Sequence, residues 1–312
     1  MRRVGFSFHE SFLHHDTGLG HPERPQRLQA ICDQLRAAGI WDHLHHLEPM
    51  PAPPETLALI HPSSYVNQIE QACREGPTAL DPDTVASPGS WDAARRAVGA
   101  VTGAIDEVLA GRLEAAFCAV RPPGHHALAD RAMGFCLFNN VALGARYAQR
   151  HRQVGRVLIV DWDVHHGNGT QAIFEEDPSV LYISTHQFPF YPGTGAHGEQ
   201  GRGEGASFTV NIPVSAGSGD AQLVQAFRET VRPKALAFRP GLLLLSAGFD
   251  AHRDDPLADL MVTESGYAEL TRIVREIAEA CCPGRLVSVL EGGYNLRALG
   301  RSVEAHLRIL MA

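Results

Sequence analysis

Short aliphatic runs without charged residues recur along this chain and alternate with segments of helical periodicity. The stretch "GLLLLSAG" (241–248) shows the pattern most clearly, because it is apolar at consecutive positions rather than at every second one. A strand of this kind suits a sheet that is covered on both faces, as parallel sheets are. Helices that connect parallel strands supply that cover through right-handed crossovers. The chain is therefore predicted to be an α/β protein with a mostly parallel sheet flanked by helices on both faces.

The expected elements follow one another without an internal repeat or a low-complexity linker, so residues 1–312 are predicted to form a single domain. The Pro-rich stretch 48–56 is short and fits a rigid surface connection, and "HLHH" (43–46) is expected at a polar helix end on the surface. The segment His186–Ser207 holds six glycines and is predicted to be a long ordered loop, a kind that is usually functional. Strands are predicted at Val4–Phe8, Ala115–Val120, Val157–Val160, Val180–Ser184, Phe208–Ile212, Leu242–Ser246 and Leu286–Leu290, and helices at Glu23–Ala38, Trp91–Ala110, Asn140–His151, Ala221–Phe238 and Glu264–Ala280.

The composition excludes several classes of protein. A formal net charge of -8 argues against a general nucleic-acid-binding surface. The first ten residues, "MRRVGFSFHE", lack the apolar core of a secretion signal, and no window approaches 18 apolar residues without a charge, so no membrane partner is expected. The six cysteines show no C-x-x-C spacing. Reduced thiols in a cytoplasmic protein are the expected state.

Residues able to do chemistry follow the ends of four predicted strands. The segments are "RPPGHH" (121–126), "DWDVHHGN" (161–168), "AGFDAHRDDP" (247–256) and "EGGYNL" (291–296). Parallel α/β sheets bind their ligands outside the carboxyl ends of the strands. The four segments are therefore expected to converge at one edge of the sheet and to form a site.

A metal site is predicted among these acids and histidines. Asp163 and His165 are two residues apart, so in an extended chain they project to the same side. Asp161 lies on that side too, and spacing alone leaves it nearly equivalent to Asp163, while His166 points away and is expected to be structural. A carboxylate and an imidazole suit zinc, and a catalytic zinc takes three protein ligands with one position left open. Asp250, at the end of another strand, is the natural third ligand.

The histidines of "RPPGHH" are candidates for acid–base catalysis. His125 and His126 follow two prolines that make the turn rigid, and histidine titrates closest to neutral pH. Such histidines need partners that fix their tautomers, and Asp161 and Asn168 flank the predicted ligands. Tyr294, in a glycine-flanked turn, could direct its hydroxyl at a developing oxyanion.

These motifs together resemble the zinc-dependent histone deacetylase superfamily, in particular its class II and bacterial histone deacetylase-like amidohydrolase branch. The stretches that carry the resemblance are "GHPERPQR", "VRPPGHHA", "GFCLFNN", "VDWDVHHGNGTQ", "YPGTG", "SAGFDAHRDDPL" and "LEGGYNL", in the family order. They extend from residue 20 to residue 296, which is nearly the whole chain. The resemblance implies the arginase–deacetylase fold with a sheet of about eight strands. It also implies removal of an acetyl (acyl) group from the Nε of acetyl-lysine in proteins or peptides.

The resemblance assigns roles to the residues of the site. It implies one zinc ion on Asp163, His165 and Asp250, a pair formed by His125 and Asp161, a principal general base and acid His126 paired with Asn168, and an oxyanion donor Tyr294. Class I members carry an aspartate where Asn168 stands. A neutral amide should raise the pKa of His126 less than a carboxylate would.

Further family features can be carried over to this chain. Acetylpolyamine-specific relatives have a glutamate at the rim where Leu257 stands, and segment 76–90 lacks the long insertion that narrows their entrance. Acetyl-lysine is therefore favoured, with acetylated polyamines or other small acetylated amines as the alternative. Arg27 resembles an arginine that lines the acetate exit path. The channel residues are Gly134, Phe135, Tyr191, Leu257 and Asp83, and the structural potassium sites correspond to Asp161, Asp163, His165, Ser184 and Thr185 and to Phe174, Asp177, Val180 and Phe208.

Two other functions compete with deacetylation. A binuclear manganese ureohydrolase needs carboxylates where this chain has Gly167 and His252, so one metal ion is favoured. A non-catalytic module that binds acetylated ligands would not need Tyr294 and the two loop histidines, all of which are present. A homo-oligomer is left open by the sequence.

Overall fold

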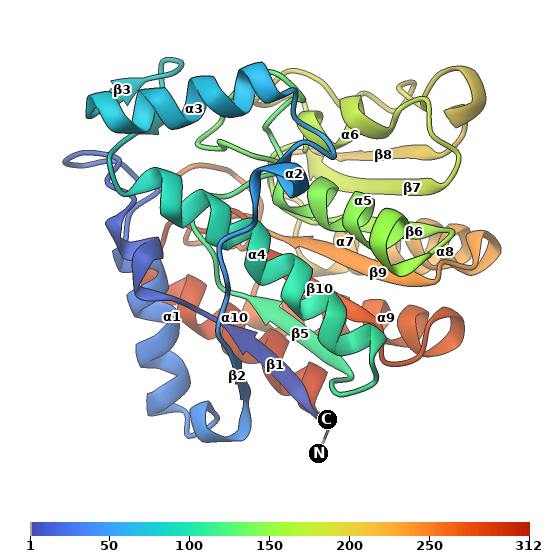
Figure 1. Ribbon diagram of the computed structural model, residues 1–312. Helices are drawn as coiled ribbons and strands as arrows, with labels where there is room; N and C mark the ends of the chain where they lie inside the picture. Colours follow the sequence, from blue (N-terminus) through green and yellow to red (C-terminus); the bar gives the residue numbers. More distant parts are fainter. Residues whose placement is uncertain (1) are drawn as a thin grey trace.

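The computed structural model describes residues 2–312 and contains one sheet of eight parallel strands between layers of helices, which confirms the expected fold class (Figure 1). The strand order is β2-β1-β5-β10-β9-β6-β7-β8. The strands are β1 Val4–Ser7, β2 His45–Leu47, β5 Ala115–Cys118, β6 Val157–Asp161, β7 Val180–Gln187, β8 Thr209–Val214, β9 Leu242–Ala247 and β10 Leu286–Leu290, with a separate hairpin of β3 Thr78–Ala79 and β4 Val85–Ala86. Strands β5, β10, β9 and β6 lie side by side and are buried at every position. The four polar segments identified in the sequence follow these four strands.

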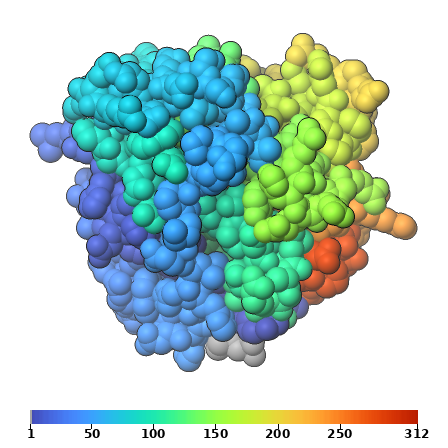
Figure 2. Space-filling view, in the orientation of Figure 1, coloured from blue at the N-terminus to red at the C-terminus, as the bar shows by residue number. Residues whose placement is uncertain are grey.

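Helices cover both faces of the sheet. Helices α4 and α5 lie on one face, and α1, α9 and α10 pack together on the other (Figure 1). Figure 2 shows the first face, on which α4 and α5, coloured teal and green, cover the middle of the sheet. The helices are α1 Gln26–Ala37, α2 Pro54–Leu57, α3 Ser63–Glu75, α4 Ser90–Leu109, α5 Asn140–Arg152, α6 Asn168–Phe174, α7 Asp220–Ala226, α8 Arg232–Phe238, α9 Glu264–Cys281 and α10 Leu296–Met311. None of these helices is both long and apolar enough to span a bilayer.

Apolar packing fixes the loops that lead to the site. The larger buried cluster surrounds the sheet, and a smaller one joins α3 and α4 to Leu137 and Phe138. In the smaller cluster the Tyr65 hydroxyl donates to the carbonyl of Leu137 at 2.6 Å, and its ring meets that of Phe138 edge-on. Burial of large apolar side chains contributes about 1.5–3 kcal/mol each. The segment after "RPPGHH" is therefore held against a packed layer.

The structure corrects several element predictions. Segment 43–46 was expected at a helix end, and a short 3-10 helix does end at His43, but His45 and His46 belong to the edge strand β2, which pairs with β1 from Gly5↔His45 onward. Helices α2, α3, α6 and α10 were not predicted. The helix expected over Ala221–Phe238 is a helical run with a π-helical segment at Phe227–Val231 between α7 and α8. Pro233 has no N–H group, so the regular α-helical hydrogen-bond pattern cannot continue through it.

Candidate active site

The two aspartates and the histidine predicted as metal ligands lie together at the carboxyl edge of the sheet. Asp163, His165 and Asp250 each offer one ligand atom, and these atoms lie within 4.8 Å of one another. The Nδ1 atom of His165 is 3.2 Å from Asp163 Oδ1 and 3.2 Å from Asp250 Oδ2. Both aspartates are buried, and His165 is 9% exposed. The sheet register explains the approach, because β6 and β9 are neighbours and pair at Asp161↔Ser246.

The chain after β6 bends, which differs from the extended geometry assumed from the sequence. Residues 163–165 form bends rather than a strand. Asp163 Oδ1 accepts the backbone N–H of His165 at 2.9 Å, and this short turn brings the two side chains together. Asp163 Oδ2 accepts the N–H of Gly292 at 2.8 Å, and Asp250 Oδ1 accepts the N–H of Val164 at 2.9 Å. Each aspartate is therefore oriented by a peptide group from another segment.

The donor set fits a divalent metal ion. Asp250 Oδ2 is buried and, apart from the 3.2 Å approach of His165 Nδ1, has no polar partner in residues 2–312, which is costly for a carboxylate oxygen. Burial alone would lower the pKa of His165, but Asp163 and Asp250 outweigh it and raise that pKa to about 10. The cluster thus attracts positive charge. Two carboxylates and one imidazole are a ligand set that zinc accepts in catalytic sites.

The two histidines of "RPPGHH" stand beside this triad with different partners. His125 Nδ1 lies 3.1 Å from Asp161 Oδ2, and the ring nitrogen Nδ1 of His126 lies 2.8 Å from Asn168 Oδ1. Because an amide oxygen only accepts, His126 Nδ1 carries the proton and Nε2 keeps a free lone pair. The rings of His125 and His126 are 4.0 Å apart between centroids. Asp161 also accepts from the Tyr182 hydroxyl at 3.0 Å, so it lies beside His125 and outside the metal triad.

The surroundings separate the pKa values of the two histidines. Burial alone would lower the pKa of His125, but Asp163 and Asp161 outweigh it and raise that pKa to about 10. Burial, together with the positive charges of His125 and His165, lowers the pKa of His126 well below its usual value. At neutral pH His126 is therefore the neutral member of the pair, which suits a general base.

A channel of about 180 Å³ reaches the triad at His165, the one triad residue in its lining. Its walls include Phe135, Tyr191 and Leu257, and Asp83 lies in the same lining. Gly134 has a φ of 56° and its backbone packs against the His126 ring, so a Cβ here would collide with that ring. The channel residues are Asp83, Pro123, His125, His126, Gly134, Phe135, His165, Phe190, Tyr191, Leu257, Gly292 and Tyr294. All five channel residues named from the sequence are thus brought together.

Tyr294 and Arg27 lie on one side of the channel. Tyr294 is 8% exposed, and its ring meets that of Phe135 edge-on at 5.9 Å. Arg27 is fully buried, places its guanidinium 4.9 Å from the centre of the Tyr294 ring and donates from Nε to the carbonyl of Gly293 at 2.7 Å. Arg27 is thus in contact with the Tyr294 loop and does not line the channel.

The residues matched to potassium sites fall into two groups. Near the triad, the Thr185 hydroxyl lies 3.5 Å from the carbonyl of Asp161, and Ser184 pairs with Asp161 across β6 and β7. Farther away, the carbonyls of Phe174 and Phe208 accept N–H groups from Asp177 and Tyr182, at 2.9 Å in each case. Val180, the remaining residue of this second group, is the first residue of β7. A carbonyl oxygen has two lone pairs, so these contacts leave one available to a cation.

Several neighbours of the site were not singled out in the sequence. Phe190 stacks on His165 with centroids 5.5 Å apart, and Glu291 accepts the N–H groups of Gly124 at 2.7 Å and His125 at 3.2 Å. Burial raises the pKa of Glu291 to about 7 against the opposing effect of His125. Glu291 directly follows a buried strand, the same signal that drew attention to Asp161. His166, predicted to be structural, bonds Thr194 and Gln171.

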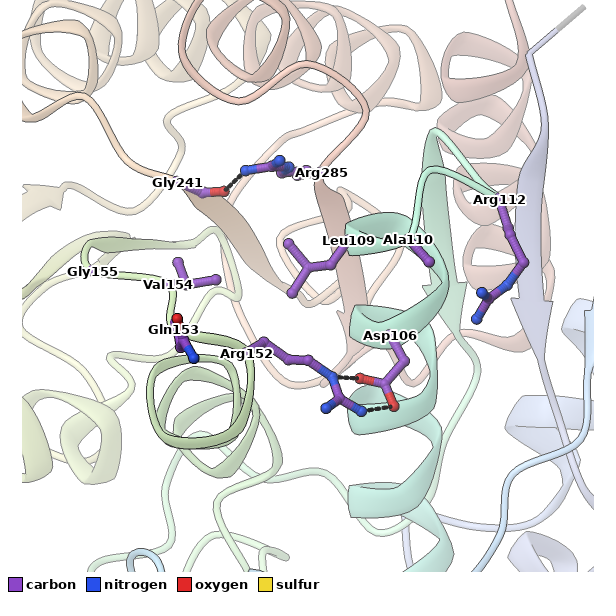
Figure 3. A pocket seen from close by; sticks show the side chains of 10 residues that line it. All are labelled: Asp106, Leu109, Ala110, Arg112, Arg152, Gln153, Val154, Gly155, Gly241 and Arg285. Atoms are coloured by element: carbon purple, nitrogen blue, oxygen red, sulfur yellow. Dashed lines mark hydrogen bonds and ion pairs between the residues drawn. The ribbon is translucent and has the colours of Figure 1, made fainter.

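A larger cavity of about 590 Å³ lies at the opposite edge of the sheet (Figure 3). Its lining includes Gly155, Gly241 and Arg285, which precede β6, β9 and β10. Arg152 donates hydrogen bonds there to both carboxylate oxygens of Asp106, at 2.6 and 2.8 Å (Figure 3). The ten lining residues include no histidine or nucleophile. The catalytic groups therefore belong to the smaller channel.

A buried ion cluster supports the loops of the site. Glu23, Arg27 and Arg121 are fully buried, and Glu23 accepts from Arg121 Nη2 at 2.7 Å and from Arg27 Nη1 at 3.1 Å. Burial alone would raise the pKa of Glu23, but Arg121 and Arg27 outweigh it and lower that pKa to about 2. Because the folded pKa is depressed, the stabilisation is present above about pH 4.3 and is lost as the pH falls towards 2.

We expect Glu23→Ala to lower the free energy of unfolding at pH 7 by about 3–5 kcal/mol, because two buried arginines lose their carboxylate. Urea unfolding followed by circular dichroism measures this difference. Asp33→Ala is the control, since Asp33 is exposed and pairs with Arg36 at 3.4 Å on the surface of α1. It should cost about 0–1 kcal/mol. Equal losses for the two variants would contradict the prediction.

The strand ends of this parallel α/β sheet gather a buried Asp–His–Asp triad that could hold a metal ion and, beside it, two histidines suited to acid–base chemistry. Residues 21–310 match the model of the histone deacetylase domain. The chain is 42% identical over 295 residues to a probable deacetylase of Archaeoglobus fulgidus, covering 94% of this chain and 82% of that protein. It is also 42% identical over 311 residues to an uncharacterised protein of Synechocystis sp., covering 99% of each. The chain belongs to the histone deacetylase family, as its motifs predict.

The fold agrees with this assignment. The crystal structure of the HDA15 HD domain superposes with a TM-score of 0.95 at 40% identity, covering 100% of this chain and 90% of that one. The arginase–deacetylase fold expected from the motifs is therefore confirmed, and the protein is a hydrolase of the deacetylase type.

Proposed function

We propose that this protein is a zinc-dependent deacetylase that removes the acetyl group from the Nε of acetyl-lysine in proteins or peptides. One observation carries the proposal: the Asp163–His165–Asp250 triad lies at the base of a narrow channel beside a neutral histidine. When bound to these three residues, zinc would polarise the acetyl carbonyl and activate a water molecule. The remaining chemistry belongs to side chains of the chain itself.

The side chains divide the proton transfers between them. His126 takes the proton of the attacking water at Nε2, because its Nδ1–H is already donated to Asn168. The Tyr294 hydroxyl donates to the developing oxyanion. His126 or the cationic His125 then protonates the leaving amine, while Asp161 stabilises His125 in its charged form. The acetate exit path inferred for Arg27 remains part of this proposal.

The channel favours a long aliphatic amine as substrate. Phe135, Phe190 and Tyr191 line it and would contact the methylene groups of an acetyl-lysine side chain. Leu257 at the rim offers no charge to a cationic polyamine. Asp83 in the same lining is suited to accept from the peptide N–H groups of a bound protein segment. Acetylated polyamines and other small acetylated amines are the second candidate.

The two remote alternatives receive less support from the structure. The position of Gly167 carries no side chain, and a Cβ there would collide with Asp161, so a second carboxylate ligand does not fit. His252 is buried and approaches Glu264 at 3.4 Å instead of the triad. A non-catalytic binder of acetylated ligands would have no use for the paired histidines beside the channel.

The setting of the enzyme forms part of the proposal. We place it in the cytoplasm, because all six cysteines are free and five of them are buried. Residues 1–312 act as a single catalytic domain around the one large sheet. Potassium ions bound at the two sets of residues matched to potassium sites have a structural role. The net charge of -8 makes acetylated protein segments better partners than nucleic acid.

We expect one zinc ion per chain, and we expect its removal to abolish hydrolysis of an acetyl-lysine peptide. Elemental analysis of the purified protein measures the ratio, and chelation followed by zinc addition tests the recovery. Asp250→Asn should reduce both zinc content and activity, whereas Asp42→Asn, at an exposed position, should change neither. Two metal ions per chain together with urea release from arginine would support a ureohydrolase instead.

A parallel assay distinguishes the two substrate classes. An acetyl-lysine peptide and acetylputrescine are compared at equal concentrations with the zinc-loaded enzyme. We expect a higher kcat/KM for the peptide. A higher value for acetylputrescine would favour the small-amine alternative, and no turnover of any acetylated amine by the zinc-loaded protein would support the non-catalytic binder.

A further inference from the structure

A second buried carboxylate, Asp255, lies between the channel rim and the catalytic loop. Asp255 is 7% exposed and is not part of the metal triad. Its Oδ2 accepts the backbone N–H groups of Tyr294 at 2.7 Å and Asn295 at 3.2 Å, and its Oδ1 accepts the N–H of Leu257 at 3.1 Å. All its side-chain hydrogen bonds in residues 2–312 are to peptide groups, and no cationic side chain pairs with it there.

These bonds join two segments that are distant in sequence. Asp255 follows β9, whereas Tyr294 and Asn295 follow β10, 39 and 40 residues later. The N–H of Leu257 fixes the Oδ1 end of the carboxylate, so Oδ2 is directed at the Tyr294 peptide. Charge-assisted hydrogen bonds of this kind are about twice as strong as neutral ones. The carboxylate therefore holds the backbone of Tyr294 from one side.

Other contacts hold the same loop at neighbouring residues. Arg27 donates to the carbonyls of Gly293 and Glu291, and Asn295 caps α10 by accepting the N–H of Ala298 at 3.1 Å. Neither residue bonds the N–H of Tyr294, which is bonded by Asp255 alone among the described residues. A loss of the carboxylate would therefore release the peptide that carries the phenol, while the flanking contacts would remain.

We propose that Asp255 is a positioning residue that fixes the Tyr294 hydroxyl at the base of the channel. The inference rests on the proposed deacetylase function, in which Tyr294 donates to the oxyanion. A catalytic group displaced by about 1 Å can cost a hundredfold in rate. The hydrogen bonds of Asp255 act on the Tyr294 loop and not on the metal ligands, because its three partners are peptide groups outside the triad.

Asp255→Asn is the variant that tests the proposal with little change in size. With the NH₂ group at the Oδ2 position, the N–H groups of Tyr294 and Asn295 both lose their acceptor. With the NH₂ group at the Oδ1 position, the N–H of Leu257 loses its acceptor. Assays at pH 8 keep the wild-type carboxyl ionised, above the pKa of about 7 to which burial and Asp250 raise it. We expect kcat for an acetyl-lysine peptide to fall at least about tenfold, with KM within about threefold and zinc content unchanged.

A double-mutant cycle separates positioning from a general structural role. In the Tyr294→Phe background, Asp255→Asn should change kcat by less than about twofold, because the hydroxyl that it positions is absent. Asp254→Asn is the matched control, since Asp254 is adjacent but exposed, and it should leave kcat unchanged in both backgrounds. The same fall in kcat with and without the Tyr294 hydroxyl would overturn the proposal, as would unchanged kcat in Asp255→Asn alone.

A spectroscopic measurement makes the test independent of turnover. The six tyrosines can be labelled with 3-fluorotyrosine, and the ¹⁹F signal of residue 294 is identified by its loss in Tyr294→Phe. In Asp255→Asn we expect this signal to shift or broaden most, with a smaller shift for Tyr267, on which the Asp255 carboxylate also acts electrostatically. If all six signals collapse, the carboxylate is required for folding and the positioning role is wrong. An inactive wild-type enzyme with a selective shift would refute the proposed function and leave the positioning of Tyr294 intact.

Discussion

Replacing His126 by alanine should lower kcat for an acetyl-lysine peptide by about 10²–10⁴-fold, which is the usual contribution of general acid–base catalysis. The Nδ1 atom of His126 is 2.8 Å from Asn168 Oδ1, so its Nε2 lone pair is available in the channel. Burial and the charges of His125 and His165 keep its pKa well below the usual value. No other histidine of the channel is available as a base, since His165 belongs to the metal triad and His125 is paired with Asp161, with its pKa raised to about 10.

The measurement is a steady-state assay of zinc-loaded protein with the metal content determined for each sample. His151→Ala removes an exposed histidine from the end of α5 and should leave kcat unchanged. His126→Ala should retain its zinc, because His126 is outside the triad. Turnover close to that of the wild type would show that another group accepts the proton, and His126 would lose its assigned role.

Local sequence patterns predicted those strands and helices whose burial is visible in the pattern of apolar residues. The run of β9 is apolar at consecutive positions because both of its faces are covered, and its predicted and observed bounds differ by one residue at one end. Strand β2, "HHL", has no such pattern, since it is an exposed edge that forms by pairing with β1. Helix α10 was missed although it carried a signal. Its apolar face is buried and Asn295 caps its first turn.

The sequence predicted those residues of the site whose positions follow directly from the ends of the parallel strands. Parallel strands bring the four polar segments to one edge, and this rule places the triad and the histidines correctly together. Spacing could not separate Asp161 from Asp163, because the difference arises from a turn at residues 163–165. The contacts of Glu291 and Asp255 depend on how loops from different strands approach one another. Local sequence patterns do not predict how these loops approach one another.

Tyr294→Phe should lower kcat by about 10²–10³-fold, the usual cost of removing one oxyanion donor, or about 2.7–4 kcal/mol of transition-state stabilisation. The substitution removes only the hydroxyl, so the edge-on contact with Phe135 and the contact with Arg27 remain. The backbone N–H of residue 294 still reaches Asp255. The loss should therefore appear in kcat, while KM changes little, because the hydroxyl binds the transition state more strongly than the substrate.

Tyr147→Phe provides the matched control for the loss of a phenol hydroxyl. Tyr147 donates to Asp106 at 3.0 Å on the surface formed by α4 and α5, and it is not among the residues that line the channel. Its substitution should affect stability by about 0.5–1.5 kcal/mol and leave kcat unchanged. A fall in zinc content with Tyr294→Phe, or a rise in KM that accounts for the whole loss of kcat/KM, would assign Tyr294 to binding. An equal fall in kcat for both variants would remove the oxyanion role altogether, because the two tyrosines share only the group that is deleted.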